Sequence, residues 1–266
     1  MRSKPARVYS SLFFLSGATG LIYELLWVRV LYQSFGSTIQ SVTTVVAAYM
    51  GGLGLGAWLF GRIADRTARP AVLYGRLEIA IGAFGVLSPL VLGFAHWLYI
   101  GTAGALALGG SASVALRFGL AALVLLIPTT LMGGTLPVLT RAFTGEDRSL
   151  LKPSLGRLYG LNTLGAMVGT ALAGFFLIEF VGVKFSLWAT AAINLAIGAA
   201  AIGLGRRRSL SDPERPPGDE QISRPAADRL RTLALILLGI TAFAALLDEI
   251  AWTRVQIGRA SCRERV

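Results

Sequence analysis

The sequence predicts an all-α polytopic membrane protein, and three observations support this fold class. Hydrophobic residues make up 54% of the 266 residues and charged residues only 15%, whereas soluble domains carry about 25% charged residues. Six apolar stretches each approach or exceed the ~20 residues that a helix needs to cross the hydrocarbon core of a bilayer. The basic residues lie in the gaps between these stretches, mostly on one side of the expected membrane.

The expected membrane spans follow one another with short connections. We place them at 8–33, 39–61, 71–95, 114–140, 157–181 and 184–205, with a seventh beginning near residue 231. Basic residues precede the first span and follow the second, fourth and sixth: Arg2, Lys4, Arg7, Arg62, Arg66, Arg69, Arg141, Arg148, Lys152, Arg206, Arg207 and Arg208. This pattern predicts that the N-terminus and the segment after the sixth span are cytoplasmic.

The spans and connections predict four parts. Residues 1–205 form a six-helix transmembrane bundle, and the polar, Pro-rich residues 206–230 form a flexible cytoplasmic linker. Residues 231–256 are expected to be the truncated first helix of a second repeat. Residues 257–266, IGRASCRERV, resemble a translated sequencing adapter and are set aside as an artefact tail. The only cysteine, Cys262, lies there, so neither a disulfide framework nor a cysteine metal site is expected.

A short motif, E-x-x-W-x-R-V, occurs twice in apolar surroundings. The first copy contains Glu24 and Arg29, and the second contains Glu249 and Arg254. Ionisable residues inside a membrane are costly and are therefore functional candidates. Because the copies are separated by half of a large membrane protein, they indicate a duplicated bundle, and the chain is then expected to be a fragment.

The intramembrane charges predict two ionic layers. The outer layer would join Glu24 and Arg29 to Arg117 and Glu179, and an inner layer around Asp65 would include Arg76, Glu78, Arg141 and Arg157. The alternative for Arg29, Arg117 and Glu179 is that they extend to the membrane interface without pairing.

Residues Gly61–Arg66, GRIADR, resemble the loop signature of major facilitator transporters. In that family an acidic and a basic residue after the second helix help to hold one gating state, and Asp65 and Arg66 match those positions. The following Thr67, Ala68 and Arg69 match only in part. An ordinary positive-inside loop with a helix-capping aspartate is the alternative.

Small residues and prolines indicate how the helices pack. Gly52, Gly54 and Ala57 fit a dinucleotide-binding pattern, but they lie inside an apolar span, so we expect a packing face formed by Gly52 and Gly56 instead. Gly165, Gly169 and Ala173 would form a similar face. Pro128 and Pro137 predict a kinked or locally open helix in which Thr129, Thr130 and Thr135 line a polar cavity.

Asn162, which lies near Tyr159 and Thr163, is a further candidate for substrate or ion binding or for gating. The alternative is that these polar side chains only form contacts between helices. The lone His96 lies beside Trp97 and Tyr99, as in an interfacial aromatic belt. We find no nucleophile–base pair, metal-ligand cluster or phosphate loop. The formal net charge of +11 does not indicate a nucleic-acid partner, because the basic residues follow the membrane topology.

Four segments together resemble the membrane part of bacterial spermidine-synthase-like proteins that carry a fused major-facilitator-type region. They are 16–31 (SGATGLIYELLWVRVL), 52–66 (GLGLGAWLFGRIADR), 127–142 (IPTTLMGGTLPVLTRA) and 156–177 (GRLYGLNTLGAMVGTALAGFFL). The resemblance implies a six-helix major-facilitator-like half bundle in the bacterial inner membrane. It also implies a second half and a soluble domain of polyamine aminopropyltransferase type, which would use decarboxylated S-adenosylmethionine and putrescine. No catalytic residue or cofactor site of that domain is in this chain.

Three functions compete at this point. The first is a transporter-like bundle that handles a polyamine or another small substrate, with Glu24, Glu249 and Asp65 in cation binding or gating. The second is a non-transporting membrane anchor or regulatory domain for a C-terminal aminopropyltransferase. The third, a complete six-helix protein with another role, is disfavoured by the repeat at Glu249. The expected partners are the lipid bilayer and the rest of the longer protein.

Overall fold

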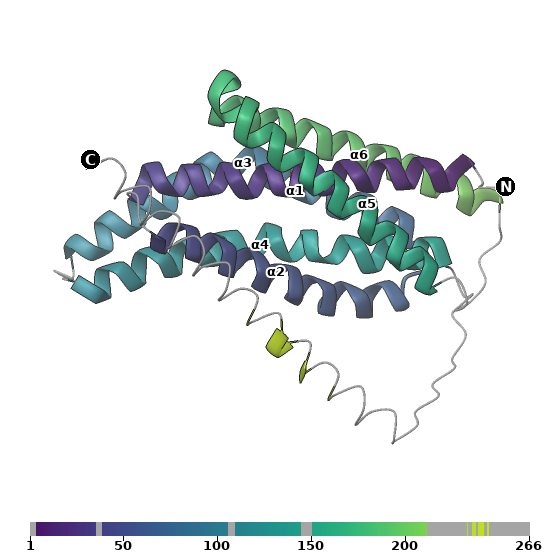
Figure 1. Cartoon of the computed structure of the whole chain (residues 1–266), viewed down its shortest axis with the longest axis horizontal. Helices are drawn as coiled ribbons and strands as arrows, with labels where there is room; N and C mark the ends of the chain where they lie inside the picture. The colour runs from purple at the N-terminus through teal and green to yellow at the C-terminus, as the bar shows by residue number, and fades with distance from the viewer. Residues whose placement is uncertain are drawn as a thin grey trace, which may run out of the picture. The chain divides into compact units, whose positions relative to one another are not determined.

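The computed structural model is all-helical and describes residues 4–35, 39–105, 110–144 and 151–211, with scattered positions between 233 and 244. The chain divides into two compact units, Met1–Pro216 and Pro217–Val266. The first unit contains α1 (Lys4–Phe35), α2 (Ile39–Asp65), α3 (Pro70–Ala105), α4 (Gly110–Thr144), α5 (Leu151–Leu172), η2 (Ala173–Val181) and α6 (Val183–Ser211) (Figure 1). In the second unit the described positions are helical, and the hydroxyl of Thr241 donates to the carbonyl of Leu237.

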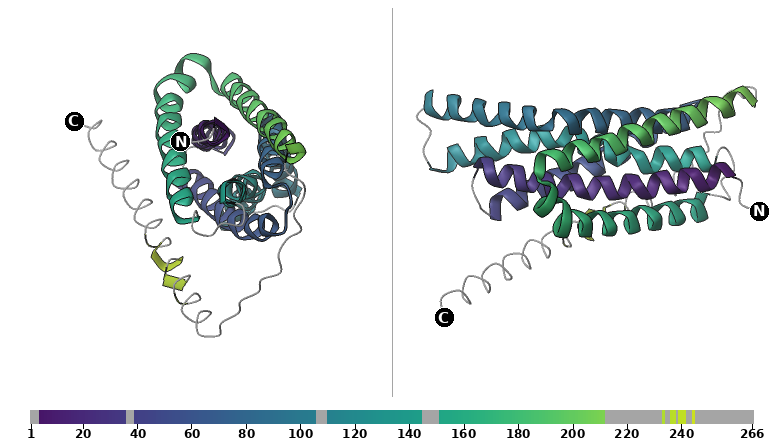
Figure 2. Two further views of the ribbon diagram at one scale, coloured as in Figure 1. Left: turned by 90° about the vertical axis from the view of Figure 1, so that its right-hand side faces the viewer. Right: turned by 90° about the horizontal axis from the view of Figure 1, so that it is seen from above.

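The helices of the first unit form one bundle around α1. The left view of Figure 2 looks along the bundle and shows α1, in dark purple, surrounded by the other helices. The contacts agree with this view, because α1 touches each of the other five helices, while α2 packs mainly on α4 and α3 mainly on α6. The helix that carries Glu24 is therefore the central element of the bundle.

In the part of the chain that the structure describes, six helices are long and apolar enough to cross a membrane. The outer surface of the bundle carries large apolar side chains, among them Leu90, Phe94, Leu123, Phe175 and Phe185, each at least 60% exposed. Isolated exposed apolar residues are normal on soluble proteins, but a surface with so many large ones indicates contact with a nonaqueous environment. These features together indicate a membrane protein.

The observed helices match the expected spans and extend beyond most of them. α3 and α4 contain 36 and 35 residues, because both helices continue past the ends of the spans expected for them. α6 continues to Ser211 and so includes the first six residues of the linker expected at 206–230. Arginine is a good helix former, and the sequence disfavours helix at the residue before Pro213.

The fifth expected span differs in its last nine residues, which form the π-helix η2 rather than α-helix. The wider turns continue to Gly182, whose N–H donates to the carbonyl of Leu177 at 2.9 Å. Gly182 has a φ of 82° and is the only residue between η2 and α6, so the chain reverses over one residue with a backbone that side chains disfavour.

Glycines bring the helices close together, as their spacing predicts. A β-carbon at Gly52 would overlap the side chain of Thr129, and one at Gly56 would overlap the carbonyl of Thr130, so α2 and α4 pack with their backbones close together. Gly165 and Gly169 pack in the same way against the backbone of α1. The predicted packing faces of α2 and α5 are therefore confirmed.

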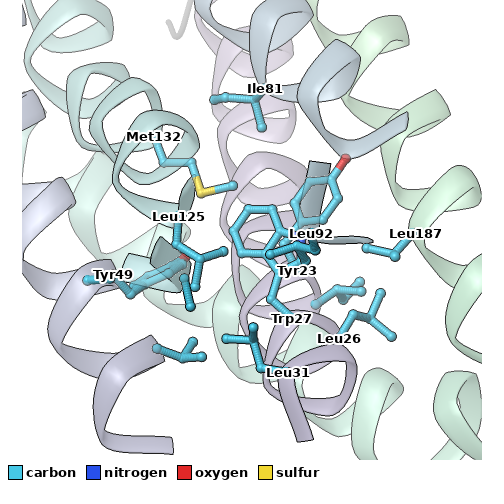
Figure 3. Packing of buried hydrophobic residues seen from close by; sticks show 14 of the residues in the cluster. Tyr23, Leu26, Trp27, Leu31, Tyr49, Ile81, Leu92, Leu125, Met132 and Leu187 are labelled. Atoms are coloured by element: carbon cyan, nitrogen blue, oxygen red, sulfur yellow. The ribbon is translucent and has the colours of Figure 1, made fainter. Parts of the chain in front are cut away.

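The buried core contains two clusters of apolar side chains. Figure 3 shows the first, in which Tyr23 stacks on Trp27 with ring centroids 5.1 Å apart. Both residues are at most 1% exposed, although they belong to the helix turn next to Glu24. The second cluster lies around Phe13, Tyr74 and Leu139.

Candidate functional site

A cavity of about 170 Å³ lies inside the bundle and is lined by polar side chains from several of its helices. Its polar lining consists of Ser16, Thr19, Glu24, Tyr49, Thr135, Asn162 and Asn194. Tyr49, Ile81 and Met132, labelled in Figure 3, contribute to its wall. Among the residues that the structure describes, this lining includes one carboxylate, two amides and no Lys, Arg or His.

Two of the predicted site residues meet in this cavity. Glu24 is half-buried on α1, and Asn162 is half-buried on α5. They can approach the same space because α1 and α5 pack closely: a β-carbon at Gly17 would overlap the backbone and side chain of Asn162. The expected polar contribution of α4 to the cavity comes from Thr135.

The other threonines of α4 hold the helix together instead. The hydroxyl of Thr129 donates to the carbonyl of Leu125 at 2.7 Å, and that of Thr130 donates to Leu126 at 2.6 Å. Thr129 also reaches the Ala48 carbonyl on α2 at 3.3 Å. These hydroxyls therefore satisfy backbone carbonyls near Pro128, and α4 is helical from Gly110 to Thr144.

The carboxyl group of Glu78 lies next to the cavity, in contact with two of its lining residues, and not where the sequence predicts. Glu78 was expected in an inner ionic layer around Asp65, but its side chain is fully buried. The hydroxyl of Ser16 donates to Glu78 Oε1 at 2.6 Å, and Nδ2 of Asn194 donates to Oε2 at 2.7 Å. Glu78 thus joins α3 to α1 and α6 through hydrogen bonds rather than through an ionic layer.

Asn194 connects this hydrogen-bonded group to the cavity. Its side chain is 1% exposed and contributes to the cavity lining, while its Nδ2 is engaged by Glu78. Its Oδ1 is buried and has no hydrogen-bond partner. A buried carbonyl oxygen without a donor is costly, so Asn194 is a candidate to accept a hydrogen bond from a ligand in the cavity.

Sequence reasoning did not select Glu78 or Asn194 for the site, although a signal was present. Asn194 is the only amide between Lys184 and Arg206, in a stretch dominated by Ala, Ile and Leu. Glu78 is an ionisable residue within a predicted span, as Glu24 is. The rule that singles out Glu24 therefore applies to Glu78 as well, but the position of Glu78 at the inner start of its span assigned it to the inner ionic layer.

The two arginines of the predicted outer layer lie near aromatic rings of their own helices. The guanidinium of Arg29, which is exposed, lies 5.5 Å from the ring centroid of Tyr32, and that of Arg117 lies 4.7 Å from Phe118. Glu179 is exposed in η2. Pairing of these residues with Glu24 stays a prediction, and Glu249 and Arg254 lie outside the described residues.

The loop motif ends α2. Asp65 is the last residue of that helix, Arg66 follows in a turn, and both side chains are exposed. The N–H of Arg66 donates to the carbonyl of Ile63 at 3.2 Å. A carboxylate is electrostatically unfavourable at a helix C-terminus, so Asp65 does not act there as a helix cap, and its role in gating stays a prediction.

The boundary at His96 is aromatic, as the sequence indicates. His96 lies 6.5 Å from Tyr99 between ring centroids, and Trp97 is 67% exposed. The hydroxyls of Tyr99 and Ser113 are 2.8 Å apart and join α3 to α4. Among the described residues, no group of three or more His, Cys, Asp or Glu side chains is arranged to hold a metal ion.

Two curated proteins are similar to this chain. It is 26% identical over 237 residues to Polyamine aminopropyltransferase 2 of Streptomyces coelicolor, a match that covers 89% of this chain and 39% of that protein. It is also 26% identical over 192 residues to Polyamine aminopropyltransferase of Leptospira interrogans, covering 71% of this chain and 34% of that protein. The chain thus spans between a third and two fifths of the length of these relatives. No protein-family profile matches the chain, and no solved structure matches it.

Proposed function

We propose that the bundle is the membrane region of a longer protein of polyamine aminopropyltransferase type, and that its cavity binds a small organic cation such as a polyamine. In this proposal the six helices act as one half of a major-facilitator-like transporter. The observation that carries the proposal is the lining of the cavity: one carboxylate, Glu24, and one buried amide oxygen without a partner, Asn194 Oδ1.

The chemistry of this lining favours a donor of N–H groups that carries positive charge. An ammonium group has three N–H donors and no acceptor, so it complements a carboxylate and a carbonyl oxygen at the same time. An anionic ligand would lie beside Glu24 without a basic side chain in the cavity lining. The names of the two similar proteins support an amine as the ligand, since both act by name on polyamines.

Glu78 would act as a positioning residue in this proposal. Its carboxyl accepts from the Nδ2 of Asn194, which fixes the orientation of the amide so that Oδ1 is left for the ligand. An amide held in one orientation binds with a smaller loss of side-chain freedom than one that rotates. Glu78 itself makes its contacts with Ser16 and Asn194, and not with the ligand.

A second function is favoured by one observation. The most deeply buried carboxyl, Glu78, is satisfied by protein hydrogen bonds in the packed interior, as expected for a rigid scaffold. In this alternative the bundle anchors or regulates a soluble aminopropyltransferase domain and moves no substrate.

Binding of radiolabelled spermidine to the full chain in lipid nanodiscs tests the proposal. Glu24→Gln is expected to weaken binding about 10- to 100-fold, because a hydrogen bond to a charged group contributes about 1.5–3 kcal/mol. Glu24→Asp, which keeps the charge, should retain part of the affinity. Thr170→Val removes an exposed hydroxyl of α5 that bonds to its own helix, and should change nothing.

Uptake into proteoliposomes by the full-length protein separates the two functions. Spermidine uptake that depends on Glu24 supports transport. If spermidine binds but is transported neither into nor out of the proteoliposomes, the result favours an anchor with a regulatory amine site. Absence of both binding and uptake in a folded wild-type protein would reject the cation site altogether.

A further inference from the structure

A groove on the bundle, separate from the cavity around Glu24, is lined by basic rather than acidic side chains. It measures about 710 Å³ and lies between the first turns of α1 and the start of α5. Arg7, Ser10 and Ser11 of α1 and Arg157 of α5 supply its polar lining, and among the residues that the structure describes no acidic side chain is part of that lining. It shares no lining residue with the cavity around Glu24.

We propose that this groove binds the headgroup phosphate of an anionic phospholipid. Arg157 is held in place for this role, because its Nη2 donates to the hydroxyl of Ser10 at 3.1 Å. A guanidinium has five N–H donors, and this bond engages one of them. Arginine binds phosphate oxygens with two parallel N–H donors, so Arg157 and the exposed Arg7 together suit a phosphodiester.

The depth of the two arginines fits a lipid headgroup. Arg7 is the first residue of the apolar span of α1, and Arg157 is close to the start of the span of α5 at Ser154. Both therefore lie at the same boundary of the expected hydrocarbon region. The distribution of basic residues predicts that this boundary is cytoplasmic, where membranes carry their anionic lipids.

The rest of the groove suits an acyl chain. Phe14, Leu15 and Leu161 complete its lining. Phe14 is seven residues beyond Arg7 along α1, which corresponds to about 10 Å toward the membrane centre. The basic part of the groove complements the phosphate of a phospholipid, and the apolar part complements the hydrocarbon that follows it. A free phosphate ion would contact only the basic part.

Lipid retention by the purified full chain tests this site. The delipidated protein is exposed to equal amounts of phosphatidylglycerol and phosphatidylcholine, and the bound lipids are counted by native mass spectrometry. The variant Arg7→Gln/Arg157→Gln is expected to lose about 30-fold of the preference for phosphatidylglycerol, since each basic residue near a membrane surface contributes about 1 kcal/mol. The control Arg62→Gln/Arg206→Gln removes two exposed arginines elsewhere and should keep the preference.

Two further measurements keep the proposal falsifiable. If the double glutamine variant does not fold, Arg7→Lys/Arg157→Lys keeps the charge but not the paired donors, and an intermediate preference is expected. Equal preference in the wild type and either double variant of Arg7 and Arg157 would overturn the site. Thermal stabilisation by inorganic phosphate as large as that by phosphatidylglycerol would show a site for a soluble anion and would overturn the lipid assignment.

Discussion

Glu78 shows how one polar side chain is accommodated in an apolar interior. Burial of a carboxyl group is costly unless hydrogen bonds replace those to water. Ser16 and Asn194 supply two such bonds from helices far apart in the sequence. The same contacts fix how α1, α3 and α6 align, so the hydrogen bonds of Glu78 both satisfy its carboxyl group and restrain the positions of the helices.

Replacement of Glu78 tests this structural role. Glu78→Leu leaves the hydroxyl of Ser16 and the amide of Asn194 without their acceptor, and is expected to lower the free energy of unfolding by about 1–3 kcal/mol. Glu78→Gln keeps one acceptor oxygen and should cost less. Reversible unfolding in detergent measures both. Equal stability of the leucine variant and the wild type would mean that these hydrogen bonds contribute nothing.

A second residue-scale feature is the pair Ser88 and Pro89 in α3. Proline lacks an N–H, so Pro89 leaves the carbonyl of Gly85 without its usual helical donor. The buried hydroxyl of Ser88 donates to that carbonyl at 2.9 Å. A serine hydroxyl thus replaces the backbone donor that the proline removes, which is how prolines are tolerated in membrane helices.

A double-mutant cycle measures this compensation. Ser88→Ala is expected to destabilise the wild type by about 1 kcal/mol, because it leaves a buried carbonyl unsatisfied. In the Pro89→Ala background the backbone N–H is restored, so the same serine change should cost little. Additive effects of the two substitutions in unfolding experiments would contradict the compensation.

The candidate residues were only partly predictable from the sequence. Glu24 and Asn162 were selected as polar residues within apolar spans, and the structure brings both to one cavity. Glu78 and Asn194 were missed, because their meeting depends on how α3 and α6 align. That alignment comes from close packing of Gly75 against Gly198, which spacing within a single helix does not reveal.

At the scale of helices, the spacing of glycines predicted a packing face on α2, and in the structure this face packs on α4. The apolar face of a membrane helix gains little from burial, since lipid is equally apolar, so close backbone contact contributes much of the association. Gly56 faces the Thr130 carbonyl and the Cα of Gly133, whereas a β-carbon added at Gly54 would meet no atom within 4 Å.

This contrast gives a matched pair of variants. Gly56→Ala places a methyl group into the backbone of α4 and is expected to destabilise the bundle by about 1–3 kcal/mol, the usual range for overpacking. Gly54→Ala adds the same methyl group at an open position and should be neutral or stabilising, by up to about 1 kcal/mol from helix propensity. Unfolding in detergent measures the difference, and equal effects of the two variants would contradict the packing.

The π-helix η2 is the element that the sequence did not predict. Apolar periodicity identifies a span but does not distinguish the hydrogen-bond pattern within it, so residues 173–181 were expected to continue the fifth helix unchanged. The sequence shows a glycine at position 182, but it does not show that this glycine adopts the positive φ by which the chain turns into α6 over one residue. η2 contains the candidate Glu179, which is exposed.

For the molecule as a whole, composition predicted the fold class, because a high apolar and low charged content indicates helices that face lipid rather than water. All six expected spans occur as helices that are long and apolar enough to cross a membrane. The arrangement of the helices around α1 was not predictable, since apolar helices in lipid lack the polar face that would identify their outer side. Orientation in the membrane is a separate property, which charge predicts and helix packing does not.

Cysteine accessibility in intact cells tests the orientation. The stretch 96–113 contains no Lys or Arg, whereas Arg62, Arg66 and Arg69 surround the end of α2, so the positive-inside rule places Ala68 in the cytoplasm and Ser111 outside. In a Cys262→Ser background, Ser111→Cys should react with an impermeant maleimide in intact cells, and Ala68→Cys only after lysis. Both positions are exposed in the bundle, so a difference in labelling reports the membrane barrier rather than burial. Labelling of Ala68→Cys in intact cells would reverse the orientation, and would move Arg7 and Arg157 away from the cytoplasmic leaflet.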